Sequence, residues 1–389
     1  MRFLHTSDWH IGRSFFGVSL LEDQAHALDD LIRVAVDARV DAVLVAGDIY
    51  DRSTPPADAV GLLDEVLTRL VIAHGIRVVA IAGNHDSGER LDFGSRLLSR
   101  HGMHVAGTRP AVVPFDDADG RIEVVAVPFA EPMAVAARRD DSGILDHDSA
   151  LRIQLADAAP QPARGKRRRP IAAPRRIAVA HAFVSGGTPC ESERPLVMGN
   201  AALVAADCFD GFAYAALGHL HRPQRAGRDE VRYCGSLLKY SFDEAAHRKG
   251  VSIVEIDGSG ACRIEEVALS LRRDVRILAG TLDEVLGAAD ADRAREDYVM
   301  VRLTDREARI DPMGTLRVAY PNCLLLDRDA YFSAQPGGAA ERIDPRRSSD
   351  TEMFVAFFRE MTGEEPGEEE ARAFADAVTA VERRCGGEG

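Results

Sequence analysis

Two residues near the N-terminus combine a carboxylate and an imidazole at a spacing that suits metal binding. Asp8 and His10 follow the strand-like residues 1–7, and side chains two positions apart in a strand point to the same side. A single Asp-x-His is more often a turn residue beside a surface histidine. Here, however, polar endings of the same kind recur along the chain, which favours the metal interpretation.

Five apolar segments end in side chains that metals bind. The segments cover residues 1–7, 41–46, 76–82, 176–180 and 212–217. In open α/β sheets, ligands gather at the carboxyl ends of the strands, so these endings can converge on one site. The candidate ligands, in chain order, are Asp8, His10, Asp48, Asn84, His181, His219 and His221.

Seven side chains are too many for one ion that must keep a position open for substrate. If Asp48 is shared, each of two ions receives four bonds and keeps room for water and a phosphate oxygen, as two-metal phosphoryl hydrolysis requires. Imidazole, carboxylate and amide ligands together suit manganese or iron, and manganese is the first choice. The sequence contains neither a Gly-x-x-x-x-Gly-Lys phosphate loop nor a Gly-x-Ser-x-Gly elbow.

The elements that must position these residues alternate between two periodicities. Helical spacing predicts helices over residues 21–40, 57–73 and 89–101, and short apolar runs between them predict strands. Such alternation is typical of parallel pairing in an α/β fold. The chain is long enough for two or three domains.

Bulk charge and targeting signals restrict the function only weakly. The net charge is −14, which argues against binding nucleic acid over the whole surface but leaves room for a local cationic track. No apolar run approaches the roughly 20 residues of a membrane span, and no signal-like block opens the chain. We therefore expect a cytoplasmic protein.

A family resemblance is carried by the candidate ligands and by four further sequence motifs, at residues 6–12, 192–196, 216–224 and 235–243. They resemble the calcineurin-like metallophosphoesterases, and within that family the nuclease subunits that process DNA double-strand breaks. The resemblance is good over residues 1–257. It implies a sandwich of two sheets flanked by helices, a smaller α+β capping domain, and a helical pair at the C-terminus.

The resemblance also implies a role for each candidate residue. One ion would be held by Asp8, His10, Asp48 and His221, and the other by Asp48, Asn84, His181 and His219. His85 would position the scissile phosphate or protonate the leaving oxygen, with Asp86 orienting it. Asp51 exceeds the ligand count, so we expect it to support a ligand or a loop.

The expected domains are a nuclease domain over residues 1–268, a capping and DNA-recognition domain over 269–340, a linker over 341–350, and a partner-binding helical segment over 351–389. Residues 138–176 interrupt the nuclease domain with an Arg-rich insertion, interpreted either as a solvated segment or as a cationic arm on DNA. The capping domain could equally be a structural appendage.

The C-terminal segment contains two apolar stripes at helical spacing. They consist of Phe354, Phe357, Phe358 and Met361, and of Phe374, Val378 and Val381. The stripes could close a hairpin on its own domain or be buried by a partner. In the family that partner is an SMC-like ATPase, and the resemblance also allows a homodimer.

Together these features predict a nuclease with two divalent ions, most suitably Mn²⁺, that cleaves duplex ends, hairpins and single strands of DNA in repair, recombination and replication, within the nucleoid. ATP dependence would reside in the partner. Two alternatives remain: a phosphodiesterase or phosphomonoesterase for small molecules, and a metal-stabilised scaffold that docks on DNA ends.

Overall fold

The computed structural model describes residues 1–141, 143–158, 175–193, 202–305, 309–327, 349–362 and 365–385. The chain divides into two compact units, Met1–Val275 and Arg276–Gly389. Several predicted features lie outside the described residues. They are the Arg-rich run of residues 164–169, most of the 341–350 linker, part of the 192–196 motif, and the side chains of Met361 and Val381.

The first unit contains a six-stranded sheet built around the N-terminal strand. Its order is β16-β15-β1-β4-β5-β6, in which β1, β4, β5 and β6 are parallel while β15 and β16 are antiparallel. The strands are β1 Arg2–Thr6, β4 Ala42–Val45, β5 Arg77–Ile81, β6 Met103–Ala106, β15 Gly250–Ile256 and β16 Cys262–Ala268. The parallel half brings the ends of β1, β4 and β5 to one edge.

A second six-stranded sheet has the order β13-β14-β12-β9-β8-β7. Its four inner strands are parallel, and both edge strands pair antiparallel. The strands are β7 Ala111–Asp117, β8 Gly120–Val127, β9 Arg175–His181, β12 Tyr214–Gly218, β13 Gln224–Ala226 and β14 Arg228–Tyr233.

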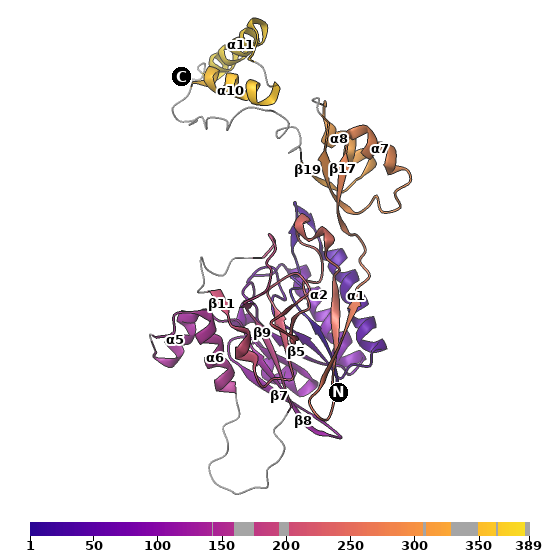
Figure 1. The fold of residues 1–389 in the computed structure, drawn as a ribbon, viewed down its shortest axis with the longest axis vertical. Helices are drawn as coiled ribbons and strands as arrows, with labels where there is room; N and C mark the ends of the chain where they lie inside the picture. Colours follow the sequence, from indigo (N-terminus) through magenta and orange to yellow (C-terminus); the bar gives the residue numbers. More distant parts are fainter. Residues whose placement is uncertain are drawn as a thin grey trace. The chain divides into compact units, whose positions relative to one another are not determined.

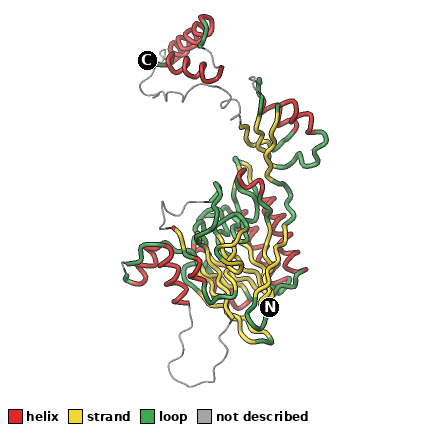
Figure 2. Tube along the Cα trace, in the orientation of Figure 1, coloured by secondary structure: helices red, strands yellow, loops and turns green. Residues whose placement is uncertain are grey.

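The two sheets face each other across a shared apolar core (Figures 1 and 2). Phe3 and Val79 of the first sheet and Val124 and Tyr214 of the second belong to one fully buried cluster. His5 of β1 also crosses the interface: its Nδ1 lies 2.8 Å from Tyr214 Oη and its Nε2 3.1 Å from the Leu217 carbonyl oxygen. These contacts hold β1 of the first sheet against β12 of the second.

Helices flank the sandwich on both sides (Figure 1). Helices α1 Leu21–Asp37 and α2 Ala57–Thr68 lie beside the first sheet, and α2 continues as a π-helical turn, Arg69–Ala73. Helices α5 Pro132–Arg139 and α6 His147–Ala158 lie beside the second, where Leu151 and Leu155 pack into its outer core. The two-sheet α/β sandwich expected from the sequence is confirmed.

One expected helix is wrong in detail. Residues 89–101 form α3 Gly88–Leu91, α4 Ser95–Leu98 and a 3₁₀ turn, Ser99–His101, instead of a single helix. Gly94 between them has φ 72°, a left-handed conformation that ends a right-handed helix. Short elements complete the unit: β2 Ser14–Phe15, β3 Val18–Ser19, β10 Phe183–Val184, β11 Leu203–Val204, and 3₁₀ turns at Ala206–Phe209 and Phe242–Ala246.

The C-terminal part has a small α+β fold followed by a helical pair. The three-stranded sheet β17-β18-β19 packs against two helices around buried Val299 and Leu316. In the pair, the rings of Phe354 and Phe374 stack with centroids 4.2 Å apart. The elements are β17 Val275–Gly280, α7 Leu282–Ala289, β18 Tyr298–Leu303, α8 Pro312–Ala319, β19 Cys323–Asp327, α10 Asp350–Thr362 and α11 Glu368–Cys385.

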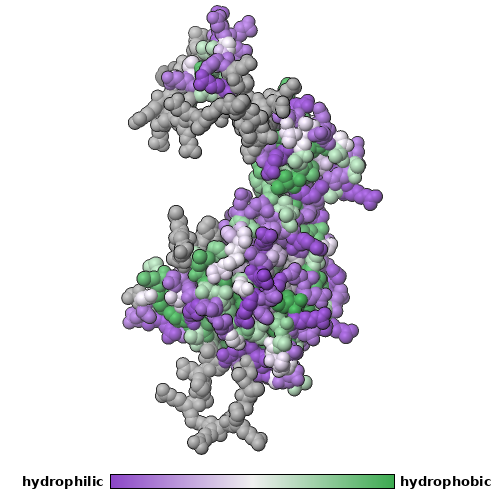
Figure 3. Space-filling model, in the orientation of Figure 1, coloured by the Kyte–Doolittle hydropathy of each residue, from purple (hydrophilic) through white to green (hydrophobic). Residues whose placement is uncertain are grey.

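On the face seen in Figure 3, the described surface is mainly hydrophilic, with apolar side chains among the charged ones. Among the helices within the described residues, none combines the length and the apolar character needed to span a membrane.

Candidate metal centre

Six of the seven candidate ligands follow the strands, and the seventh, His181, is the last residue of β9. Strand β1 ends at Thr6, so the strand alternation expected from the sequence does not place Asp8 beside His10. Strand β12 likewise ends at Gly218, before His219 and His221. Instead, four candidates have positive φ: Asp8 52°, His10 46°, Asp48 50° and His219 104°.

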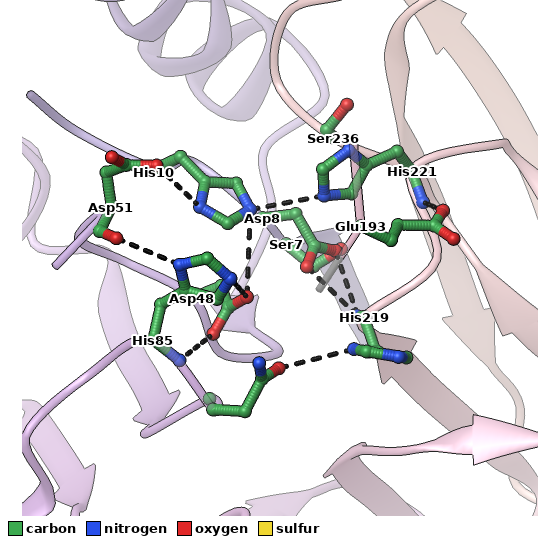
Figure 4. A network of polar contacts seen from close by, with 12 residues as sticks. Ser7, Asp8, His10, Asp48, Asp51, His85, Glu193, His219, His221 and Ser236 are labelled. Atoms are coloured by element: carbon green, nitrogen blue, oxygen red, sulfur yellow. Dashed lines mark hydrogen bonds and ion pairs between the residues drawn. The ribbon is translucent and has the colours of Figure 1, made fainter. Parts of the chain in front are cut away.

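Left-handed backbone at a non-glycine residue costs on the order of 1–3 kcal/mol and persists only where the surroundings hold it. Here the loops after β1 and β4 hold each other: the Asp8 amide donates to the Gly47 carbonyl and the His10 amide to the Asp48 carbonyl, each at 3.0 Å. These strained loops turn the side chains toward a common centre (Figure 4).

The first group of donors surrounds His10. Its Nε2 lies 3.1 Å from His221 Nε2 and 3.6 Å from Asp48 Oδ2. One ligand atom each of Asp8, His10 and His221 lies within 4.8 Å of the others. This is the set that the resemblance assigns to one ion.

The second group surrounds Asn84. Its Oδ1 lies 2.9 Å from His181 Nε2 and 3.2 Å from His219 Nδ1. His181 Nε2 is in turn 3.6 Å from Asp48 Oδ2, the oxygen that faces His10 at the same distance. The structure therefore brings all seven candidates together, with Asp48 between the two groups.

Glycine is needed where the backbone closes around Asp48. A Cβ at Gly83 would lie 2.1 Å from Asp48 Oδ1, and a Cβ at Gly218 would lie 1.9 Å from the Ala46 carbonyl oxygen. Both distances are far below contact, so the Gly-Asn and Gly-His pairs in the sequence reflect close packing as well as turns.

The electrostatics of this cluster fit divalent cations. Burial and the charge of Asp48 raise the pKa of Asp8 well above its usual value. Burial would also raise the pKa of Asp48, but the charges of His181 and His10 outweigh it and hold that pKa below normal. Burial lowers the pKa of His221 to about 3.

Imidazoles kept neutral by burial present lone pairs, and carboxylates packed this closely repel each other. A cation between His10 Nε2 and His221 Nε2, which face each other at 3.1 Å, would satisfy both nitrogens and relieve the repulsion. The donor set therefore fits the metals that the resemblance implies.

His85 sits at the edge of the cluster and retains a solvent-exposed fraction of 13%. Its Nδ1 lies 2.8 Å from the Asp51 carbonyl oxygen, and its Nε2 lies 3.9 Å from Asp48 Oδ2. The contact that orients this imidazole thus comes from the backbone of Asp51, whereas the sequence analysis assigned that task to Asp86.

The carboxylate of Asp86 instead joins two loops. It accepts hydrogen bonds from the amides of Gly83 and Tyr50, both at 2.9 Å, and of Ile49 at 3.1 Å. Burial and the nearby charge of Asp48 raise the pKa of Asp86 to about 7. Asp86 therefore positions the loops that carry Asp48 and Asn84.

The expected supporting position of Asp51 matches its contacts. Asp51 Oδ1 lies 3.5 Å from His10 Nδ1 and 3.3 Å from the guanidinium of Arg13. Four further residues contact His221 or its partners and had no assigned role: Ser192, Glu193, Glu244 and Lys249. Ser192 and Glu193 belong to the 192–196 motif, but the sequence alone does not tell which residues of a motif contact the metal centre.

Two facing sheets with paired donor sets at their carboxyl ends define a metal-dependent phosphoesterase. Residues 1–223 match the family model of the calcineurin-like phosphoesterases, which implies a dinuclear metal site and hydrolase activity. Residues 271–362 match a second family, described as the type 5 capsule protein repressor C-terminal domain.

A relative of known family identifies the group of phosphoesterases to which the chain belongs. Over 388 residues the chain is 31% identical to the SbcD subunit of the nuclease SbcCD from Staphylococcus saprophyticus subsp. saprophyticus, covering 98% of each chain. The chain therefore belongs to the SbcD family.

Two solved structures align with part of this chain, each at 12% sequence identity. TT1561 of Thermus thermophilus has a TM-score of 0.36 and covers 68% of this chain and 98% of its own. A dimetal phosphatase from Danio rerio has a TM-score of 0.38 and covers 69% of this chain and 96% of its own.

Proposed function

We propose that this chain is the nuclease subunit of an SbcCD-type complex and hydrolyses phosphodiester bonds in DNA. The observation that carries the proposal is Asp48, whose Oδ2 lies 3.6 Å from both His10 Nε2 and His181 Nε2. A carboxylate shared between two donor sets is the arrangement that a two-metal phosphodiesterase needs.

The two donor sets divide as the resemblance implies. Asp8, His10, Asp48 and His221 would hold one ion, and Asp48, Asn84, His181 and His219 would hold the other. When bound, the ions neutralise charge on the transferring phosphoryl group and lower the pKa of water. We favour Mn²⁺ because the donors mix imidazole, carboxylate and amide oxygen.

His85 serves as the proton donor to the leaving oxygen. Its Nδ1–H donates to the Asp51 carbonyl, so Nε2 is the nitrogen that faces the centre, and the imidazolium form of the ring carries on Nε2 the proton that is transferred. Asp86 acts indirectly, by holding the backbone on both sides of Asp48 and Asn84.

The C-terminal regions bind the macromolecules. The α+β domain after Val275 grips DNA, and α10 and α11 bind the SMC-like ATPase SbcC. Phe357 on α10 is 60% exposed although it lies in the apolar stripe, which supports burial by a partner. The match to the staphylococcal SbcD extends over these regions, which an enzyme for small phosphate esters does not need.

The chain also forms a homodimer through the surface between α2 and α4. An apolar groove of about 630 Å³ lies there, lined by Val60, Leu63, Ile72, Phe93 and Leu98 among others. Phe93 is 87% and Leu97 72% exposed. Exposed apolar side chains beside a groove are typical of protein–protein interfaces, and a second copy of the chain is the partner we propose for it.

The activity is tested with the chain purified together with SbcC. We expect Mn²⁺-dependent cleavage of linear duplex ends and of DNA hairpins when ATP is present, as part of DNA repair and recombination at the nucleoid. Hydrolysis of bis-p-nitrophenyl phosphate serves as the test of the isolated chain. Hydrolysis of that ester without any cleavage of DNA, even with SbcC and ATP, would disprove the nuclease proposal.

A further inference from the structure

His221 is held at every polar group except the nitrogen that faces the other ligands. Its backbone amide donates to Glu193 Oε1 at 2.6 Å, and its carbonyl accepts from Lys249 Nζ at 2.7 Å. Its Nδ1 lies 2.6 Å from Ser192 Oγ. Only Nε2 is left for the centre, where it faces His10.

The hydrogen bond at Ser192 has a defined direction. Its hydroxyl donates to Glu244 Oε1 at 2.5 Å, so the same oxygen accepts the proton on His221 Nδ1. Glu244 is paired with Lys249 at 2.5 Å, and both side chains are fully buried. The relay therefore runs from Lys249 through Glu244 and Ser192 to His221, and it keeps Nε2 unprotonated.

The second donor set has no comparable relay among the described residues. His181 Nδ1 contacts a backbone carbonyl, that of Ala46, at 2.9 Å, so its tautomer is set without help from a side chain. The two donor sets thus differ in one respect: the orientation of His221 depends on Ser192, in the loop after β10, whereas that of His181 depends on a main-chain carbonyl.

We propose that Ser192 is a positioning residue that sets the metal affinity of one half of the centre. By fixing the tautomer and ring orientation of His221, it strengthens binding by Asp8, His10, Asp48 and His221 and leaves the set around Asn84 unaffected. Arg13 anchors this loop, since its guanidinium donates to the Ser192 carbonyl at 3.1 Å. The inference rests on the proposed dinuclear function.

The test is Mn²⁺ titration of the metal-free full chain by calorimetry, with electron paramagnetic resonance of the loaded protein. Wild type should bind two ions and give the spectrum of a coupled pair. In Ser192→Ala we expect one ion to bind about 10- to 100-fold more weakly, with a mononuclear signal at intermediate Mn²⁺. Ser192→Thr keeps the hydroxyl and should restore both ions.

Ser185→Ala is the matched control, because Ser185 is an exposed serine in the same loop, and it should behave as wild type. Thermal melting of the metal-free variants checks that the fold is retained. Two ions binding to Ser192→Ala as tightly as to wild type, or equal weakening of both ions, would overturn this inference alone. A wild-type chain that binds a single ion would overturn the dinuclear centre, and the inference with it.

Discussion

The chemistry of single residues here depends on where each imidazole nitrogen points. His85 and His221 lie on either side of His10, with ring centroids 4.7 and 5.1 Å from it. Their Nδ1 partners nevertheless differ: a backbone carbonyl for His85 and a serine hydroxyl within a charged relay for His221. Both partners leave Nε2 facing the cluster, and exposure distinguishes the proposed proton donor, which is 13% exposed, from the proposed ligand, which is buried.

His85→Ala should retain metal and lose activity. The imidazole is partly exposed and lies outside the two donor sets, so its removal should leave Mn²⁺ binding nearly unchanged. Cleavage should fall by about 10²- to 10⁴-fold, the usual contribution of a general acid. The matched control is His74→Ala, which removes an exposed histidine outside the cluster. An unchanged rate for His85→Ala would remove the proposed role.

Asp48→Asn should abolish binding of both ions. Asp48 Oδ2 faces both donor sets, and the neutral amide removes the charge that they share. The metal-free variant should be less stable than wild type at neutral pH, because the lowered pKa of Asp48 means that its ionised form stabilises the fold. Metal analysis and thermal melting measure the two effects, and retention of two tightly bound ions would contradict the shared role.

At the scale of elements, β1 places the buried side chain of His5 against the second sheet. This histidine makes the free energy of unfolding depend on pH. Burial lowers the pKa of His5 to about 3, whereas the unfolded chain has a histidine pKa near 6.5. Between these values the unfolded state binds more protons, so the free energy of unfolding falls as the pH falls. At pH 4.5 the free energy of unfolding is lower by about 3 kcal/mol because of His5, at roughly 1.4 kcal/mol per pH unit.

His5→Asn removes this dependence. The variant should be less stable than wild type at pH 7.5, because contacts to Tyr214 and Leu217 are lost. It should then lose about 2–3 kcal/mol less than wild type between pH 7.5 and 4.5. Urea unfolding of the metal-free chain at both values measures the difference, and parallel losses in the two proteins would refute the assignment.

A substitution in the C-terminal helices should weaken partner binding without changing hydrolysis. Phe357→Glu places a charge on the exposed ring of α10 and should weaken SbcC binding at least tenfold, because a charge cannot be buried in an apolar interface. Hydrolysis of bis-p-nitrophenyl phosphate should not change. The control is Thr351→Glu, at an exposed position on the same helix. Co-purification with full-length SbcC is the measurement, and undiminished binding would exclude this face.

At the scale of the whole molecule, the proposed dimer depends on the groove between α2 and α4. Leu98→Asp introduces a charge into that groove and should convert a dimer into a monomer in light scattering. Leu98 is 38% exposed, so the monomer should remain folded and hydrolyse the small ester. Leu145→Asp, at an exposed leucine of the same unit outside that groove, is the control. A wild-type chain that is monomeric at all concentrations would contradict the interface.

Residue types and their order along the chain were enough to predict the α/β class and the seven side chains that the structure brings together, with Asp48 between the two groups. Those features depend on local patterns: apolar runs that end in Asp, Asn or His, and helical periodicity between them. The same patterns misplaced a helix at residues 89–101, where the left-handed Gly94 interrupts the periodicity.

Only the tertiary structure decided how the donors meet. Asp8, His10, Asp48 and His219 converge through positive φ in loops, and not through strand alternation. The partners of His85 and His221 likewise come from positions 23 to 34 residues away in sequence, including Asp51, Ser192, Glu244 and Lys249. Such contacts arise when loops from neighbouring strands and from facing sheets pack together, and no local pattern encodes the distance between side chains that only packing brings together.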